Sequence, residues 1–441
     1  MADIEQAPQQ TETAVEKERD GNEAFLVTFS PDDPENPQNW SKKTKWGVTA
    51  ALTATGFNRI MLSTIMASAI NTIAIDLNMT NLDRLFITNV WVLIWNLICG
   101  FANSKGLLLA SRLLAGFGAS AVYALGYGVL GDVWPPEQRG RSLGIYLLVP
   151  LLGAAFGPIL GGLQAILAVA SIPFVIETYA PLLLHRKAES LRKNTADPRY
   201  YAEIETREEG RSAAWKLQNS LSRPLRLLMF HPIVQIQAIL GAINYGLLYF
   251  ALSSFSSLFV SAYGEPVSIS GFHYIALCLG EVAGAQICGP SMDYTYRKLT
   301  ARAGGNSSPE LRIPLMVPGA ILTPIGLLLY GWAAQYNMFW LVVDLGAAVL
   351  SLGMQVFGTT LQAYVMDSYP EHVSSASAAT QFLRSLTAFA FPLFAPRMYE
   401  TLGYGWGNSM LAFLSIGIGL PSTGLLWRCG AKLRAKKQSS Y

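Results

Sequence analysis

Residues 152–162 read LGAAFGPILGG, and this uncharged run of small residues constrains the fold more than any other feature of the chain. Four glycines, two alanines and a proline fill seven of its eleven positions. In a soluble helix each interior glycine costs about 1 kcal/mol and a proline about 3 kcal/mol. In lipid the backbone must stay hydrogen-bonded, so the helix persists, and small residues let a neighbouring helix approach closely. The run therefore predicts a tight, bendable helix–helix contact inside a membrane protein.

The composition supports a chain that crosses the membrane several times. Of its 441 residues, 51% are hydrophobic and only 14% are charged, whereas soluble domains carry about 25% charged residues. The net charge of +3 is too small to suggest a nucleic-acid partner. The four cysteines lack the spacing of metal ligands, and no catalytic triad or phosphate-binding loop is recognisable. We therefore expect a membrane protein without metal or cofactor rather than an enzyme.

The apolar runs predict an all-α protein with two membrane halves. The first half has spans at about residues 47–75, 85–101, 107–130 and 142–163, followed by a weak span at 164–176. That weak span is shorter than the roughly 20 residues that a crossing helix needs. The second half has six spans, at 233–263, 269–291, 313–334, 338–366, 376–394 and 410–427. The predicted domains are a disordered cytosolic tail (1–45), an N-terminal membrane half (46–184), a charged cytosolic loop (185–227), a C-terminal membrane half (228–428) and a basic cytosolic tail (429–441).

The positions of the basic clusters indicate that one crossing is missing. Lys and Arg favour the cytosolic ends of membrane helices. In the second half the basic clusters are separated by even numbers of spans, as cytosolic clusters should be. In the first half, three spans separate Lys45 from Arg139, which would place them on opposite sides. The most economical site for a lost helix is the polar patch at 78–84, which joins the first two spans directly.

Several motifs, in order, resemble one transporter family. They are DPENPQNWS (33–41), RLLAGFGAS (112–120), LGAAFGPILGG (152–162), ETYAP (177–181), GPSMDYTYRKL (289–299) and the stretch from LRSLTAF to GWGNS (383–409). Together they resemble a fungal major facilitator superfamily transporter of the drug:proton antiporter type. The resemblance implies a two-half helical bundle of twelve spans. This chain matches with about 10–11 spans, because helix two and part of helix six are missing.

The resemblance assigns roles in the first half and in the eighth helix. The antiporter motif would form a hinge and packing seam through Gly153, Gly157, Pro158, Gly161 and Gly162. The alternative for these residues is generic small-residue packing. Arg112 would serve proton coupling, or it would reach the lipid headgroups as an interface arginine. Glu281 is a candidate proton site, because a carboxylate in lipid must pair or take up a proton.

Further polar residues are candidates for a solute cavity or for a cytosolic gate. The cavity candidates are Asn58, Arg59, Asn244, Tyr245, Gln355, Gln362 and Arg384. For the amides among them, hydrogen bonding between helices is the alternative. The gate candidates are Asp132, Arg139, Arg141, Asp293 and Arg297. Asp293 and Arg297 stand four residues apart and are expected to pair locally. Simple anchoring by positive charge would explain the same residues, and both roles can coexist.

These features predict an exporter of drugs or secondary metabolites that is driven by the proton gradient. Its partners would be membrane lipid, protons and a small organic substrate, and we expect a monomer in the plasma membrane. Two alternatives stay open. One is a polyamine or other small-solute transporter of the same fold. The other is a truncated remnant or gene-model artefact that does not transport.

Overall fold

The structure, a computed structural model, describes residues 25–30, 32–50, 53, 127, 129–147, 180–208 and 213–435. The chain divides into two compact units. The first unit comprises residues 1–45 and 176–221, and the second comprises residues 46–175 and 222–441. Helix α10 (Ala213–Phe230) runs across the boundary between residues 221 and 222.

The first unit joins an N-terminal segment to the helices of the central loop. It contains η1 (Pro37–Asn39), α8 (Ala180–Thr195) and α9 (Glu203–Glu208). Val27 packs with Ala188 and Ala202 in a small apolar core, and its amide donates to the Tyr201 carbonyl at 2.9 Å. Lys187 forms an ion pair with Asp33. The hydrogen bond from Lys187 holds the pKa of the Asp33 carboxyl below its ordinary value, so this carboxylate is charged at neutral pH.

Two expectations for this region change. Residues 25–30 and 32–45 make the contacts just described, so the prediction of a disordered tail does not hold for them, while residues 1–24 lie outside the described ranges. The predicted first membrane half ended at residue 184. In the structure residues 180–184 are the first turns of α8, whose next residues are His185, Arg186 and Lys187. A salt bridge from Arg192 to Glu205 at 2.7 Å and a hydrogen bond between His185 Nδ1 and Glu205 Oε1 at 2.5 Å tie α8 to α9.

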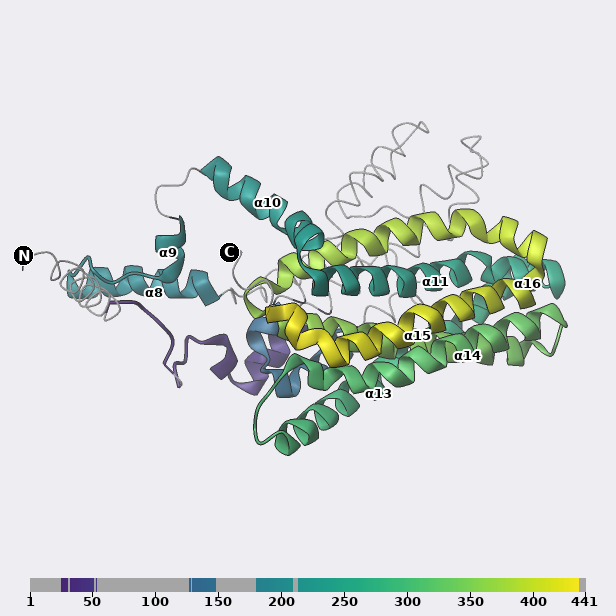
Figure 1. Cartoon of the computed structure of the whole chain (residues 1–441), viewed down its shortest axis with the longest axis horizontal. Coiled ribbons are helices and arrows are strands. Elements are labelled where there is room, and N and C mark those ends of the chain that lie inside the picture. The colour runs from purple at the N-terminus through teal and green to yellow at the C-terminus, as the bar shows by residue number, and fades with distance from the viewer. Residues whose placement is uncertain are drawn as a thin grey trace, which may run out of the picture. The chain divides into compact units, whose positions relative to one another are not determined.

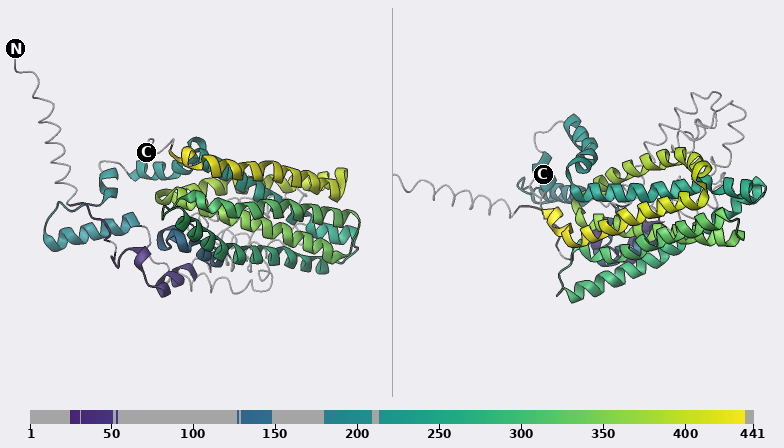
Figure 2. Two further views of the ribbon diagram at one scale, coloured as in Figure 1. Left: turned by 60° about the horizontal axis from the view of Figure 1, so that its bottom comes forward. Right: turned by 45° about the vertical axis from the view of Figure 1, so that its right-hand side comes forward.

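The second unit contains a bundle of long helices. Its labelled elements are η2 (Pro136–Gln138), α11 (Pro232–Ala262), α12 (Val267–Ser270), η5 (Gly271–His273), α13 (Tyr274–Arg302), η6 (Pro309–Leu315), α14 (Met316–Gln335), α15 (Trp340–Ser368), η7 (Pro370–His372) and α16 (Val373–Ala435). Residues 139–147 are also helical. Figures 1 and 2 show α11 and α13–α16 as rods packed side by side.

The helices of this unit follow the six predicted spans of the second half. Five helices in the described part of the chain are long and apolar enough to cross a membrane, by length and composition. The longest, α16, covers the last two predicted spans and turns at Gly403, whose φ of 71° and ψ of 173° are non-helical. Glycine adopts positive φ without the steric cost that a Cβ would impose. Figure 1 shows α16 running to one end of the bundle and returning, so it counts as two spans.

Glycines set the close approach of α14 and α15. They stand seven residues apart on each helix, at Gly319 and Gly326 on α14 and at Gly346 and Gly353 on α15. A Cβ at Gly326 would lie 2.2 Å from the Leu350 amide nitrogen, and one at Gly353 would lie 2.5 Å from the Thr323 amide nitrogen. Small residues at such a seam maximise van der Waals contact, which drives helix association in lipid.

Gly326→Ala should destabilise the bundle strongly, because the added methyl group meets backbone atoms that cannot move aside. Overpacking of this kind costs about 1–3 kcal/mol, and we expect the upper end of that range. Fluorescence-detected thermal unfolding in detergent measures the loss. Gly417→Ala is the matched control, since no atom lies within 4 Å of the position its Cβ would take. Equal melting temperatures for the two variants would contradict the packing argument.

Candidate functional site

A buried ion network at one end of the second unit joins segments that lie far apart in the sequence. We call it the Asp367 network, and it consists of Arg139, Arg312 and Asp367. Arg139 donates through Nη1 to Asp367 Oδ1, and Arg312 donates through Nε to Asp367 Oδ2. The side chains of Arg139, Arg312 and Asp367 are 5%, 0% and 4% exposed. Charges this deeply buried persist only when paired, so the three groups hold each other in place.

Backbone carbonyls also accept hydrogen bonds from the two arginines, although Arg312 Nη1 is buried without a partner in the described part of the chain. Arg139 Nε donates to the Trp134 carbonyl at 2.9 Å, and Nη2 donates to the Gly131 carbonyl at 2.7 Å. Arg312 Nη2 donates to the Pro136 carbonyl at 2.5 Å. The Arg312 guanidinium also lies 4.5 Å from the ring centroid of Tyr296. The network therefore fastens residues 131–139 to the ends of α13, η6 and α15.

A second contact lies next to this network, where Asp293 of α13 caps the helix at residues 139–147. Its Oδ1 accepts from the Gly140 amide at 2.8 Å, and its Oδ2 accepts from the Arg141 amide at 2.9 Å. A carboxylate at a helix N-terminus satisfies amides that have no partner within the helix, and it interacts favourably with the helix dipole. Asp293 thus locks the start of this helix onto α13.

Small residues let these two helices touch. A Cβ at Gly140 would lie 2.6 Å from both Asp293 Oδ1 and the Gly289 carbonyl oxygen. A Cβ at Gly144 would lie 2.8 Å from the Ala285 carbonyl oxygen. Gln286 also donates to the Gly144 carbonyl at 3.0 Å. The contact between the helix at residues 139–147 and α13 therefore extends over about two turns of α13, from Ala285 to Asp293.

The structure places the predicted gate residues at this end of the bundle but changes their pairing. Asp293 and Arg297 form no ion pair in this described stretch of the chain. Arg297 Nε donates instead to the Asp293 backbone carbonyl at 3.2 Å, because the carboxylate is taken by the helix start. Arg141 and Arg297 line a cavity beside Asp293. Asp132 is half-buried in the helical residues 129–133, which end before Pro135.

Two of the network's members were not on the list of site residues predicted from the sequence. Asp367 looks like a boundary charge at the end of an apolar span, and Arg312 looks like one more cytosolic cation. Their only signal is that each stands directly beside a membrane helix, where buried charges occur. The pairing joins Arg139 to a carboxylate 228 residues away, and no local pattern reports such a contact.

The predicted cavity amides mostly serve packing within the second half. Gln362 is buried and joins Gln237 of α11 at 3.3 Å to Ser377 of α16 at 2.9 Å. Asn244 donates to the Met354 carbonyl at 3.1 Å, and Gln355 donates to Thr359 at 3.2 Å. These bonds fit the alternative of interhelical hydrogen bonding for Asn244 and Gln362. Whether they also contact a solute stays a prediction.

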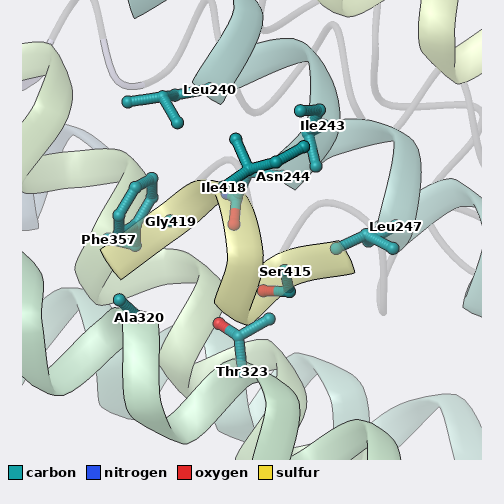
Figure 3. A pocket seen from close by; sticks show the side chains of 10 residues that line it. All are labelled: Leu240, Ile243, Asn244, Leu247, Ala320, Thr323, Phe357, Ser415, Ile418 and Gly419. Carbon is teal, nitrogen blue, oxygen red and sulfur yellow. The ribbon is translucent and has the colours of Figure 1, made fainter. Parts of the chain in front are cut away.

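Asn244 also lines a small cavity inside the bundle (Figure 3). Apolar side chains of α11, α15 and α16 surround it, together with Thr323 of α14 and Ser415 of α16. The volume is about 20 Å³, which is room for about one water molecule. In this conformation the cavity has no room for an organic solute, and it is lined by residues of the second half alone.

Three other predicted residues lie in the described helices. Tyr245 packs against Tyr249 with ring centroids 5.1 Å apart. Arg384 of α16 lies against Gly241 of α11, and its Nε is buried without a hydrogen-bond partner in the described part of the chain. Glu281 is half-buried on α13, and the described residues give its carboxylate no hydrogen bond or salt bridge. Glu281 stands one turn from Ala285, on the helix face that meets residues 139–147.

The remaining predicted residues lie outside the described ranges. They are Gly153, Gly157, Pro158, Gly161 and Gly162 of the antiporter motif, together with Arg112, Asn58 and Arg59. Their predicted roles stay predictions. The same holds for the predicted loss of helix two and of part of helix six.

Comparison with known proteins fits the helical bundle and the apolar spans. Residues 46–392 match the Major Facilitator Superfamily. The chain therefore belongs to the Major Facilitator Superfamily, and it is a multi-pass membrane transporter of small molecules rather than an enzyme. The fold class and the family predicted from the motifs are confirmed.

Relatives from fungi include proteins named as efflux pumps. The chain is 66% identical over 372 residues to the probable efflux pump mfs2 of Aspergillus flavus. The alignment covers 80% of this chain and 88% of the relative. It is 34% identical over 467 residues to the efflux pump vrtL of Penicillium aethiopicum, with 95% and 91% covered. An uncharacterised transporter of Schizosaccharomyces pombe is 34% identical over 493 residues, with 98% of each chain covered. That alignment is longer than the 441 residues of this chain, so it contains gaps on this chain's side.

A solved structure shares the fold. The proton:xylose symporter XylE superposes with a TM-score of 0.57 at 13% sequence identity, and the match covers 88% of this chain and 96% of XylE. At this identity the likeness establishes the two-half transporter fold alone.

Proposed function

We propose that this transporter exports small organic molecules across the fungal plasma membrane while protons enter in exchange. The efflux pumps among its relatives support the direction. The observation that carries the mechanism is the Asp367 network, because it joins residues before Arg139 to the second half through buried charges. A contact of this kind has two discrete states, formed and broken, as alternating access requires.

The network acts as the cytosolic gate in this proposal. The basic clusters at 297–312 and in the C-terminal tail assign its end of the bundle to the cytosol. With the network formed and Asp293 capping residues 139–147, the cytosolic end is closed and solute leaves outward. Breaking both contacts opens the cytosolic end so that solute can load.

Glu281 carries the proton in this proposal. A carboxylate in a membrane helix with no cationic partner alternates between charged and neutral forms at lower cost than one held in an ion pair. Its place on the face of α13 that meets residues 139–147 puts its charge at the seam that opens and closes. Arg112 would tune this step from the first half, and the antiporter motif would form the hinge.

Transport by everted plasma-membrane vesicles tests the proposal. Vesicles with an acidic lumen, containing the full chain, should accumulate members of a panel of fluorescent drugs, and a protonophore should abolish the uptake. Glu281→Gln should remove the response to the proton gradient, whereas Glu281→Asp should keep part of it.

Two results would contradict the proposal. Loss of drug from the lumen under the same gradient would indicate an importer. Absence of transport for every drug, in protein that binds lipid and unfolds cooperatively, would favour the truncated remnant.

A further inference from the structure

A histidine lies between two carboxylates at the opposite end of the second unit from the Asp367 network. His273 closes η5, Glu265 lies in the connection after α11, and Asp344 lies in the second turn of α15. The ring Nδ1 is 2.8 Å from Asp344 Oδ2, and Nε2 is 2.9 Å from Glu265 Oε2. The side chains of His273, Asp344 and Glu265 are 8%, 10% and 22% exposed. We call these three residues the external histidine site, since the charge pattern assigns this end to the outside.

The geometry requires one more proton than a neutral imidazole ring and two ionised carboxylates carry together. A neutral imidazole has one N–H donor and one lone pair, so it can satisfy only one carboxylate. The other carboxylate would then face the ring's lone pair, and the two would repel each other. When the ring is protonated, both nitrogens donate, and each carboxylate receives one charge-assisted hydrogen bond.

The surroundings isolate this site from other charges. Phe259 stacks on the His273 ring with centroids 3.5 Å apart and an interplanar angle of 3°. Trp340 meets the ring edge to face at 5.5 Å. Asp344 Oδ1 is buried without a hydrogen-bond partner in the described part of the chain. The site thus holds an acceptor that the protein itself leaves unsatisfied.

Among the described residues, Tyr263 is the other titratable side chain that faces these carboxylates, and it directly follows α11. Its hydroxyl donates to the Met338 carbonyl at 2.6 Å. Burial, and then the negative charges of Asp344 and Glu265, raise the pKa of Tyr263, so it stays neutral. Tyr274 of α13 donates to the Leu252 carbonyl, away from the site. The proton must therefore be shared among His273, Glu265 and Asp344.

We infer that the external histidine site is a proton-binding site, which takes a proton from the outer medium and thereby fastens residues 263–273 to α15. The proton moves from water to the ring, and the charge of the site changes from −2 to −1. When the proton leaves, Glu265 is the group that separates, because it is the most exposed of the three and stands in a loop. The inference rests on the proposed function only where it connects this site to transport.

The fluorescence of Trp340 reports the charge on His273, because a protonated imidazole quenches an adjacent indole. The full chain in lipid nanodiscs is titrated from pH 4.5 to 8.5. Wild-type emission should fall on acidification with one midpoint, and His273→Gln and Trp340→Phe should each abolish this change. His185→Gln is the matched control, since His185 also faces a carboxylate but belongs to the first unit. Its titration should match the wild type.

Glu265→Gln tests the role of the carboxylates. Removing one of two nearby negative charges should lower the midpoint of the titration, because the protonated ring loses one of its two anionic partners. An unchanged midpoint in Glu265→Gln would overturn the inference, as would a wild-type titration that persists in His273→Gln.

The outcome also separates this inference from the proposed function. A titration of His273 in a protein whose transport ignores the proton gradient would keep the site and refute proton-coupled export. Proton-driven export without a titration of His273 would do the reverse.

Discussion

Asp367→Asn should reduce export at least tenfold. The Asn side chain keeps one oxygen, which can accept a hydrogen bond from one arginine. Its NH2 group would face the other arginine, and two donor groups cannot form a hydrogen bond with each other. Arg139 and Arg312 are almost fully buried, so one cation would lose its partner in a place that water does not reach. Breaking a buried ion pair costs about 3–5 kcal/mol, which would depopulate the closed gate by more than a hundredfold.

Export rate and cytosolic accessibility measure this effect together. A single cysteine at Glu137 should react faster with a water-soluble maleimide in the Asp367→Asn background. Glu189→Gln is the control for the change from acid to amide, because Glu189 pairs with Lys193 on an exposed helix face. Exposed pairs of this kind contribute about 0.5 kcal/mol or less. Wild-type export in Asp367→Asn would refute the role of the network.

Gly140→Ala should also abolish most export, through sterics rather than charge. The methyl group would lie 2.6 Å from the Gly289 carbonyl oxygen, which belongs to the rigid backbone of α13. The helix at residues 139–147 would have to move away. The hydrogen bonds from the Gly140 and Arg141 amides to the Asp293 carboxylate would then lengthen. We expect at least a tenfold loss of export with normal membrane insertion.

Gly131→Ala is the control for this substitution. Gly131 stands in the same segment, and its Cβ would lie 3.4 Å from a Val373 methyl group, which is ordinary contact. Export should be normalised to the amount of folded protein in a size-exclusion profile. Equal export by the two variants would show that the seam at Gly140 does not govern the gate.

The sequence was sufficient to predict the helices of the second half because length and hydropathy are local properties. The spans expected at 313–334 and 338–366 correspond to α14 and α15 within a few residues. The motifs also identified the family, which the comparison confirms. The sequence did not predict the ordered N-terminal segment. Val27 of this segment is held by contacts with Ala188 and Ala202, which lie far away in the central loop.

The candidate site was less predictable because its contacts are tertiary. Asp293 was correctly singled out, but a spacing of four suggested Arg297 as its partner, whereas the amides of Gly140 and Arg141 take both carboxylate oxygens. His273 and Asp344 stand 71 residues apart, and no sequence pattern relates them, yet the packing of the helices brings them to 2.8 Å. Pairings between distant segments leave no periodic signal in one sequence.

The most direct test of the gate is the distance between its two sides during transport. Spin labels at Glu137 and at the exposed Arg302 would report it by double electron–electron resonance, after replacement of Cys99, Cys278, Cys288 and Cys429 by serine. We expect a short-distance population when the gate is closed, a longer one when the proton gradient drives turnover, and loss of the short population in Asp367→Asn. One distance distribution that neither the gradient nor Asp367→Asn changes would contradict this expectation.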